Sequence, residues 1–202
     1  MSGAIARYDA AYFRTWYRDT ASRVSTAASA ARKARMALGV AEYYLEAPVR
    51  SVLDVGCGEG QWAPVLRKLR PGIRYRGIDA SAFAVQKWGA KRNLTLGTFA
   101  ELPTLLDETR YDLIVCSDML YYVPTRELVA GLAVLAARLD GVAFLEAYTD
   151  ADAIEGDTAN WERRDAAAWR RLFRGAGLVP CGPHCYAGPP LASMVMQLER
   201  GR

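Results

Sequence analysis

A glycine-rich stretch with an aspartate directly before it could bind a charged ligand. In the sequence VLDVGCGEG, residues 52–60, an apolar run is followed by Asp54 and then by glycines at every second position, namely Gly56, Gly58 and Gly60. Glycine loops after buried strands commonly hold phosphate groups, which a carboxylate would repel. Asp54 instead favours a ligand whose nearby part is cationic, because opposite charges attract.

A second aspartate indicates which ligand carries that cation. Asp79 ends the next predicted strand, about 20 residues beyond the loop, where a carboxylate can hold two ribose hydroxyls. A dinucleotide fingerprint would require a glycine three residues after Gly58, but this position is Gln61, so a nicotinamide oxidoreductase is disfavoured. A nucleoside with a cationic group remains, and S-adenosylmethionine, with its sulfonium and ammonium, has that charge pattern.

The elements that position these residues alternate between strands and helices. Strands are predicted over residues 50–55, 74–79, 93–98, 111–117 and 141–147. Helices are predicted over residues 61–69 and 124–139, and after the capping residues Ser81 and Asp165. Such alternation is typical of a mostly parallel sheet with helices on its faces. Residues 178–186 and 191–198 are predicted to form a closing hairpin.

The N-terminal part of the chain is predicted to form a helical arm. Between Asp9 and Leu45 the sequence is rich in alanine and has no proline. We therefore divide the chain into an arm or lid, residues 1–47, and a domain, residues 48–202. Aromatic residues lie on one broad helix face of the arm, namely Tyr8, Tyr12, Phe13, Trp16 and Tyr17. This face either docks on the core or closes over a sulfonium, which aromatic rings attract.

Four motifs together resemble the class I S-adenosylmethionine-dependent methyltransferases. They are VLDVGCGEG, YRGIDAS, GTFAELP and RYDLIVCSDMLYYV, in the family's order and at similar spacing, over about residues 50–147. The resemblance implies a Rossmann-like, seven-stranded, mostly parallel sheet whose last strand is antiparallel, with helices on both faces. It also implies S-adenosylmethionine as the cofactor, with its methionine part over the glycine loop and its ribose on Asp79.

The resemblance further implies a set of cofactor-binding residues. The family often has an acid beside the adenine, where this chain has Thr98, so the adenine amino group is expected on Glu101 or on main-chain atoms. The Phe99 main chain and the Ala80 side chain would flank the ring. The full expected set is Asp54, Gly56, Cys57, Gly58, Gly60, Trp62, Asp79, Ala80, Phe99, Ala100, Glu101, Ser117 and Tyr17.

The residues after the fourth strand are the expected catalytic residues. There the resemblance places groups that face the methyl, which selects Asp118, Tyr121 and Tyr122. Methyl transfer is an in-line displacement, so a neutral amine needs mainly placement, whereas a hydroxyl usually needs a base or a metal. His184 is the single histidine and the candidate base for O-methylation, although its position in the predicted hairpin favours a bystander.

Further residues of the predicted acceptor pocket lie beyond the fifth strand. Glu146 and Tyr148 end that strand, and Trp161 lies in the long connection that follows. A small-molecule acceptor is expected, with an amine favoured over a hydroxyl. The alternatives are a non-catalytic S-adenosylmethionine-binding subunit that supports a partner, or an RNA-directed methyltransferase.

Composition limits which other classes of protein and binding site are expected. The 202 residues fit one domain, and a formal net charge of +4 does not demand nucleic acid. The basic residues of the arm raise an RNA-binding hypothesis but are predicted to form a solvated helix face; they are Arg14, Arg18, Arg23, Arg32, Lys33 and Arg35. No metal-ligand spacing is visible among the four cysteines and the histidine. A cytoplasmic protein with free thiols is expected, since no apolar stretch is long enough to span a membrane.

Overall fold

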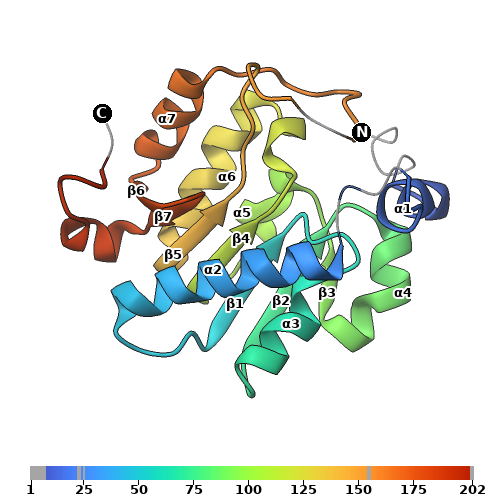
Figure 1. The fold of residues 1–202 in the computed structure, drawn as a ribbon, viewed down its shortest axis with the longest axis horizontal. Helices are drawn as coiled ribbons and strands as arrows, with labels where there is room; N and C mark the ends of the chain where they lie inside the picture. The colour runs from blue at the N-terminus through green and yellow to red at the C-terminus, as the bar shows by residue number, and fades with distance from the viewer. Residues whose placement is uncertain (1–7, 22–23, 25, 154–155, 201–202) are drawn as a thin grey trace.

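The chain folds into one seven-stranded sheet between two layers of helices (Figure 1). The computed structural model describes residues 8–21, 24, 26–153 and 156–200. The strand order is β3-β2-β1-β4-β5-β7-β6, and β7 is antiparallel to both of its neighbours. The strands are β1 (Ser51–Val55), β2 (Arg74–Asp79), β3 (Leu94–Leu96), β4 (Tyr111–Cys116), β5 (Leu139–Leu145), β6 (Val179–Gly182) and β7 (Cys185–Ala187). The predicted Rossmann-like fold is therefore confirmed.

Alternating side chains of the strands build a core on each side of the sheet. In β1, Leu53 and Val55 point to one side and Val52 to the other, as the period of two requires. One side is covered by α2 (Ala27–Leu45), α3 (Trp62–Leu69) and α4 (Ala82–Arg92). The other is covered by α5 (Leu102–Leu105), α6 (Thr125–Ala137) and α7 (Ala166–Gly175). Strands β1, β2, β3, β4 and β5 run parallel, so their carboxyl ends meet at one edge.

The arm expected to be helical between Asp9 and Leu45 contains two helices rather than one. It is divided into α1 (Ala10–Tyr17) and α2. Helix α2 begins anew at Thr26, whose hydroxyl accepts from the Ser29 amide while the Ser29 side chain accepts from the Thr26 amide. Its face with Ala34, Ala37 and Ala41 is fully buried against the sheet, whereas α1 lies apart, near α4 (Figure 1). The division of the chain into an arm or lid, residues 1–47, and a domain, residues 48–202, stays a prediction.

The closing hairpin is shorter than expected. Its strands are β6 and β7, with the turn at residues 183–184, where His184 has a left-handed φ of 55°. The strand predicted over residues 191–198 is wrong, because Pro189 and Pro190 lack N–H groups for a sheet and begin a 3-10 helix, η3 (Pro189–Met194), instead. Predicted caps are confirmed, since Ser81 and Asp165 accept from the amides of Ala84 and Ala168.

Several features of the described residues bear on the composition arguments. All four cysteines are free thiols. Within the described ranges, no three His, Cys, Asp or Glu side chains gather as a metal site. No helix in the described part of the chain has the length and apolar character needed to cross a bilayer.

Candidate active site

The glycine loop after β1 turns sharply at the carboxyl edge of the sheet. Gly56, Gly58 and Gly60 have φ values of 69°, 56° and 71°, in the left-handed region that favours glycine. A Cβ on Gly56 would lie 2.6 Å from the Met119 Cγ, and one on Gly58 would lie 3.0 Å from the Tyr17 hydroxyl. The side chains of Met119 and Tyr17 therefore lie directly against the loop backbone.

Asp79 ties the loop to the end of β2. Its Oδ2 accepts from the Gly58 amide at 2.6 Å, and its Oδ1 accepts from the Ser81 amide at 2.8 Å. Burial raises the pKa of Asp79, and these two hydrogen bonds act in the opposite direction. Each oxygen keeps a further lone pair, so the carboxylate can accept two hydroxyl donors while it holds the loop.

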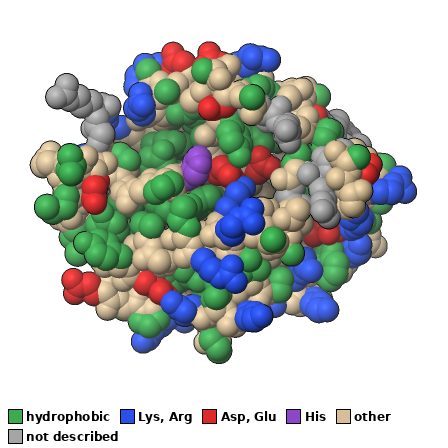
Figure 2. Space-filling model, viewed as in Figure 1, with side chains coloured by type: hydrophobic (Ala, Val, Ile, Leu, Met, Phe, Trp, Pro, Cys, Tyr) green, Lys and Arg blue, Asp and Glu red, His purple; other side chains and the backbone are tan. Residues whose placement is uncertain are grey.

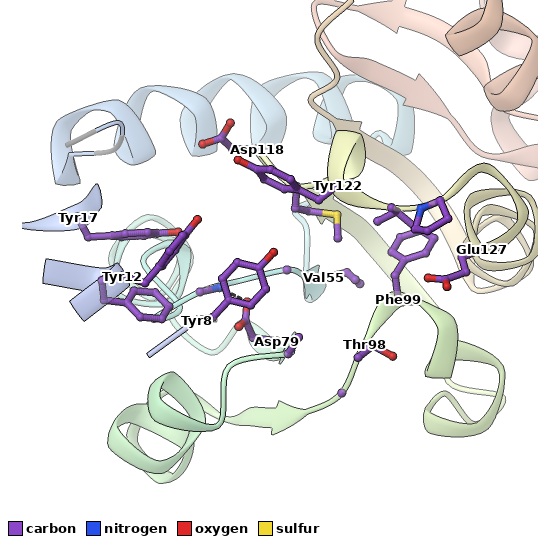
Figure 3. A pocket seen from close by; sticks show the side chains of 18 residues that line it. Tyr8, Tyr12, Tyr17, Val55, Asp79, Thr98, Phe99, Asp118, Tyr122 and Glu127 are labelled. Atoms are coloured by element: carbon purple, nitrogen blue, oxygen red, sulfur yellow. Dashed lines mark hydrogen bonds between the residues drawn. The ribbon is translucent and has the colours of Figure 1, made fainter. Parts of the chain in front are cut away.

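A main cavity of about 360 Å³ opens above Asp79 and the loop. Its size falls within the usual range for small-molecule sites, about 300–1,000 Å³. Figure 3 shows aromatic rings of residues 8–17 on one side, and Thr98, Phe99 and Glu127 at the opposite end. The lining residues are Tyr8, Tyr12, Phe13, Tyr17, Val55, Gly56, Gly58, Asp79, Ala80, Gly97, Thr98, Phe99, Asp118, Met119, Tyr122, Val123, Pro124 and Glu127.

A minor cavity of about 40 Å³ adjoins the main cavity between the loop and α2. It is lined by Tyr17, Lys33, Asp54, Gly56, Cys57, Gln61, Trp62, Ser117 and Asp118. Tyr17, Gly56 and Asp118 line both cavities, so they mark the junction between them. A ligand that extends from one cavity into the other passes these three residues.

Asp54 lines the minor cavity, and its pKa lies close to neutral pH. It points to the α2 side of the sheet, is 1% exposed, and accepts from the Tyr75 hydroxyl at 2.7 Å. Burial raises the pKa of Asp54 to about 7; the Tyr75 hydrogen bond opposes this, and the nearby Asp79 adds to it. A ligand cation in the minor cavity would favour the ionised form.

Lys33 brings a positive charge to the same cavity. Its Nζ lies 2.7 Å from Oε2 of Glu146, which is 3% exposed and also accepts from the Ser117 hydroxyl at 2.7 Å. Burial raises the pKa of Glu146, but the Lys33 ammonium and Ser117 outweigh burial and lower it overall. The prediction of a fully solvated face for the basic residues of the arm is therefore wrong for Lys33. The one available signal was its place among the buried alanines of α2.

Asp118 holds an unusual backbone conformation at the junction. Its φ is 61°, which is uncommon for a non-glycine residue and often marks functional positions. The Tyr121 hydroxyl donates to its Oδ1, and burial raises its pKa. Tyr121 is buried and packs against Tyr122, Tyr148 and Trp161, with ring centroids 4.5–6.0 Å apart. Of the expected catalytic residues, Asp118 and Tyr122 line the main cavity. Tyr121 does not line it, but its hydroxyl group holds the Asp118 carboxylate through the hydrogen bond.

Helix α1 closes one side of the main cavity. Phe13 is 2% exposed, with its ring centroid 5.7 Å from that of Phe83 on α4. The Ser81 hydroxyl donates to the Tyr8 carbonyl, and Arg18 forms an ion pair with Glu59 of the glycine loop. The aromatic face of α1 therefore both docks on the core and covers the loop. Trp16 alone of the five predicted aromatic residues does not line the cavity.

Five of the expected site residues line neither cavity, namely Tyr121, described above, and four others. Glu101 is exposed and accepts from the amide and the hydroxyl of Thr98, in a capping box, and Ala100 is exposed beside it. Gly60 faces Leu94 and Arg92. His184 is exposed on the β6–β7 turn. The single histidine, purple in Figure 2, lies at the surface among hydrophobic side chains with acidic ones beside it.

The remaining expected residues are brought together at the two cavities. Ala80 and Phe99 line the main one, and Cys57, Trp62 and Ser117 line the minor one. Lys33, Met119 and Glu127 were not expected there. Nothing in the local sequence signals that Glu127 faces the cavity, because the orientation of α6 over the sheet decides it.

Comparisons with known proteins show which family the chain belongs to. The family model described as "Methyltransferase domain" matches residues 14–186. The ribosomal protein L11 methyltransferase of Cupriavidus necator is 41% identical over 71 residues, which are 35% of this chain and 23% of that protein. The corresponding protein of Cupriavidus metallidurans is 41% identical over 78 residues, 37% of this chain. The chain spans about a quarter of the length of these curated relatives.

Solved structures share the fold at low sequence identity. Streptomyces venezuelae DesVI has a TM-score of 0.63 and 16% identity, covering 80% of this chain and 92% of its own. The 1,6-didemethyltoxoflavin-N1-methyltransferase of Burkholderia thailandensis, solved with 1,6-didemethyltoxoflavin and S-adenosylhomocysteine, has a TM-score of 0.53 and 20% identity. It covers 77% of this chain and 78% of its own.

Proposed function

The chain belongs to the methyltransferase-domain family, and from this premise we propose that it transfers a methyl group from S-adenosylmethionine to a small-molecule amine. The observation that carries the proposal is the pair of adjoining cavities, which share three lining residues. The main cavity offers a carboxylate for ribose and aromatic walls, and the minor cavity offers charges of both signs. Asp118 and Tyr17 lie where the two meet.

The residues present fit the cofactor part by part. Asp79 would accept from both ribose hydroxyls, and the adenine would lie toward Thr98 and Phe99. In the minor cavity, Asp54 would attract the methionine ammonium and Lys33 the carboxylate. The sulfonium joins the ribose to the methionine, so it would lie at the junction, beside Tyr17 and Asp118.

At the junction, the chain's own residues orient and desolvate the reacting groups. Bound S-adenosylmethionine supplies an electrophilic methyl group and leaves as S-adenosylhomocysteine. The Tyr17 hydroxyl rests over Gly58, and burial raises the pKa of Tyr17, which keeps this hydroxyl protonated. Asp118 can accept a hydrogen bond from the acceptor's N–H and so align its lone pair with the methyl. After transfer, the extra proton on nitrogen passes to Asp118 or to water.

An amine fits these walls better than a hydroxyl does. The lining carboxylates and the rings of Tyr12 and Tyr122 attract cationic or N–H-bearing groups. His184, the base expected for a hydroxyl, lies outside the lining of both cavities.

Turnover tests the proposal. The protein is incubated with methyl-labelled S-adenosylmethionine and matched panels of amines and phenols, and labelled products are identified by mass spectrometry. We expect label on amine nitrogen. Tight cofactor binding with no transfer to either panel would support the non-catalytic alternative, and transfer confined to phenols would reverse the choice of acceptor.

Cofactor binding is expected to release a proton from Asp54. In the free protein its pKa is about 7, so about half of the Asp54 side chains carry a proton at pH 7. The methionine ammonium would lower this pKa and expel the proton. Titration calorimetry at pH 7 in buffers of different ionisation enthalpy measures the released fraction, which Asp54→Asn should abolish. Proton uptake, or no exchange in the wild type, would contradict the assignment.

The raised pKa of Asp54 also determines how its contribution to the free energy of unfolding changes with pH. Between pH 4 and pH 7 unfolded Asp54 loses its proton while the folded residue keeps it. The contribution of Asp54 to the free energy of unfolding therefore falls as pH rises through this window. Asp54→Asn should flatten that part of the pH dependence of the melting temperature.

Helix α1 is expected to hold the cofactor in place as a lid. Deleting residues 1–20 removes Tyr8, Phe13 and Tyr17 from the cavity wall and the Arg18–Glu59 ion pair from the loop. The KM for S-adenosylmethionine should rise by about tenfold or more, since a buried ring is worth about 1.5–3 kcal/mol. Circular dichroism should show the sheet intact, because α2 remains. An unchanged KM would reject the lid.

A further inference from the structure

The end of the main cavity beyond Asp79 has a carboxylate without a partner. Glu127, in the first turn of α6, lines the cavity together with Thr98 and Phe99. The other two lining carboxylates are engaged: Asp79 by two backbone amides, and Asp118 by the Tyr121 hydroxyl. Within the described part of the chain, the Glu127 carboxylate accepts no hydrogen bond and forms no ion pair. It is therefore available to a ligand.

Packing of Phe99 against α6 fixes where Glu127 lies. A Cβ on Gly131 would lie 2.2 Å from the Phe99 Cε1, so the glycine lets the ring rest on the helix. Glu127 precedes Gly131 by one helical turn, on the same face. Figure 3 shows its carboxylate on the cavity side of α6, next to Phe99. An aromatic ring bound in this end of the cavity would meet Phe99 and, at its edge, Glu127.

We infer that Glu127 recognises the 6-amino group of the cofactor's adenine, an inference that rests on the proposed function. With the ribose on Asp79 and the charged methionine part in the minor cavity, the base extends toward this end. Adenine offers N–H donors at its 6-amino group and acceptors at its ring nitrogens, and a carboxylate only accepts. Glu101, the side chain expected from the sequence for this task, is exposed and occupied by Thr98.

Paired ligands and paired variants test the inference. The affinities of S-adenosylhomocysteine and of its analogue with hydrogen in place of the 6-amino group are measured by calorimetry. The proteins are the wild type, Glu127→Ala, Glu127→Gln and the control Glu101→Ala. The wild type should prefer the amino ligand by about tenfold or more, as expected for a hydrogen bond to a charged group. This preference should vanish in Glu127→Ala, persist in reduced form in Glu127→Gln, and remain in Glu101→Ala.

The outcomes separate this inference from the proposed function. A preference that survives in Glu127→Ala and is lost in Glu101→Ala would overturn the inference and return the role to Glu101. A preference unchanged in both variants would also overturn it and indicate recognition by main-chain atoms. If the folded wild type binds neither ligand, the proposed function fails, and the inference fails with it. Glu127 is half-buried at the start of α6, and a thermal melt without ligand confirms that each variant is folded.

Discussion

Replacing Asp79 by alanine is expected to weaken binding of S-adenosylhomocysteine by about 100-fold or more. Two ribose hydroxyls would lose a charged acceptor, and hydrogen bonds to charged groups contribute about 1.5–3 kcal/mol each. The amides of Gly58 and Ser81 would also lose their partner, so the loop would no longer be held in its bound shape. Calorimetric titration measures the loss, and Asp79→Asn, which keeps one acceptor oxygen, should bind with intermediate affinity.

A matched control lies at the opposite edge of the sheet. The Asp112 Oδ2 accepts from the amides of Arg50 and Ser51 at 2.7 and 3.0 Å, as Asp79 does at the carboxyl edge. Asp112→Ala should lower the melting temperature and leave ligand affinity unchanged. If Asp79→Ala is folded and binds as tightly as the wild type, the ribose lies elsewhere.

Replacing Asp118 by asparagine is expected to lower kcat/KM for the amine by about 100-fold, the lower end of what a positioned acid or base contributes. Asparagine tolerates the positive φ of 61° and can still accept from Tyr121, so the local structure should persist. The charge that orients the amine and that can accept the proton after transfer is lost. Affinity for S-adenosylhomocysteine should change by no more than about threefold, because the protein groups proposed to accept hydrogen bonds from the cofactor are other side chains, such as Asp79.

The pH profile provides a second measurement for Asp118. Burial raises its pKa, so wild-type activity should fall as the pH drops through that raised value and the carboxylate becomes neutral. Asp118→Asn should lose this acidic limb. Tyr121→Phe removes the hydrogen bond that stabilises the ionised form, and should move the limb to higher pH with a smaller loss of rate. An Asp118→Asn protein with wild-type kcat/KM would exclude Asp118 from catalysis.

The fold was predictable because its signals are local. Apolar runs bounded by glycine or proline, and caps such as Ser81, indicate single elements, and their alternation dictates a parallel sheet. The loop glycines were predictable for the same reason, since their left-handed φ values allow little else. The break between α1 and α2 was missed because the alanine-rich composition masked the capping box at Thr26 and Ser29.

The rest of the site depends on contacts between distant segments. Lys33 meets Glu146 across 113 positions of sequence, and Glu127 faces the cavity only because Phe99 packs on Gly131. No periodicity encodes such pairings. Conversely, Glu101 matched a sequence pattern but caps its own helix instead of lining the cavity. The roles of the predicted site residues stay predictions until binding is measured.

The most direct test of the central claim is calorimetric titration of the wild-type protein with S-adenosylhomocysteine and, in parallel, with NADH. The adjoining cavities, with Asp79 in one and Asp54 and Lys33 in the other, predict binding of S-adenosylhomocysteine and none of NADH. Binding of NADH, or of neither ligand by a folded protein, would contradict the account.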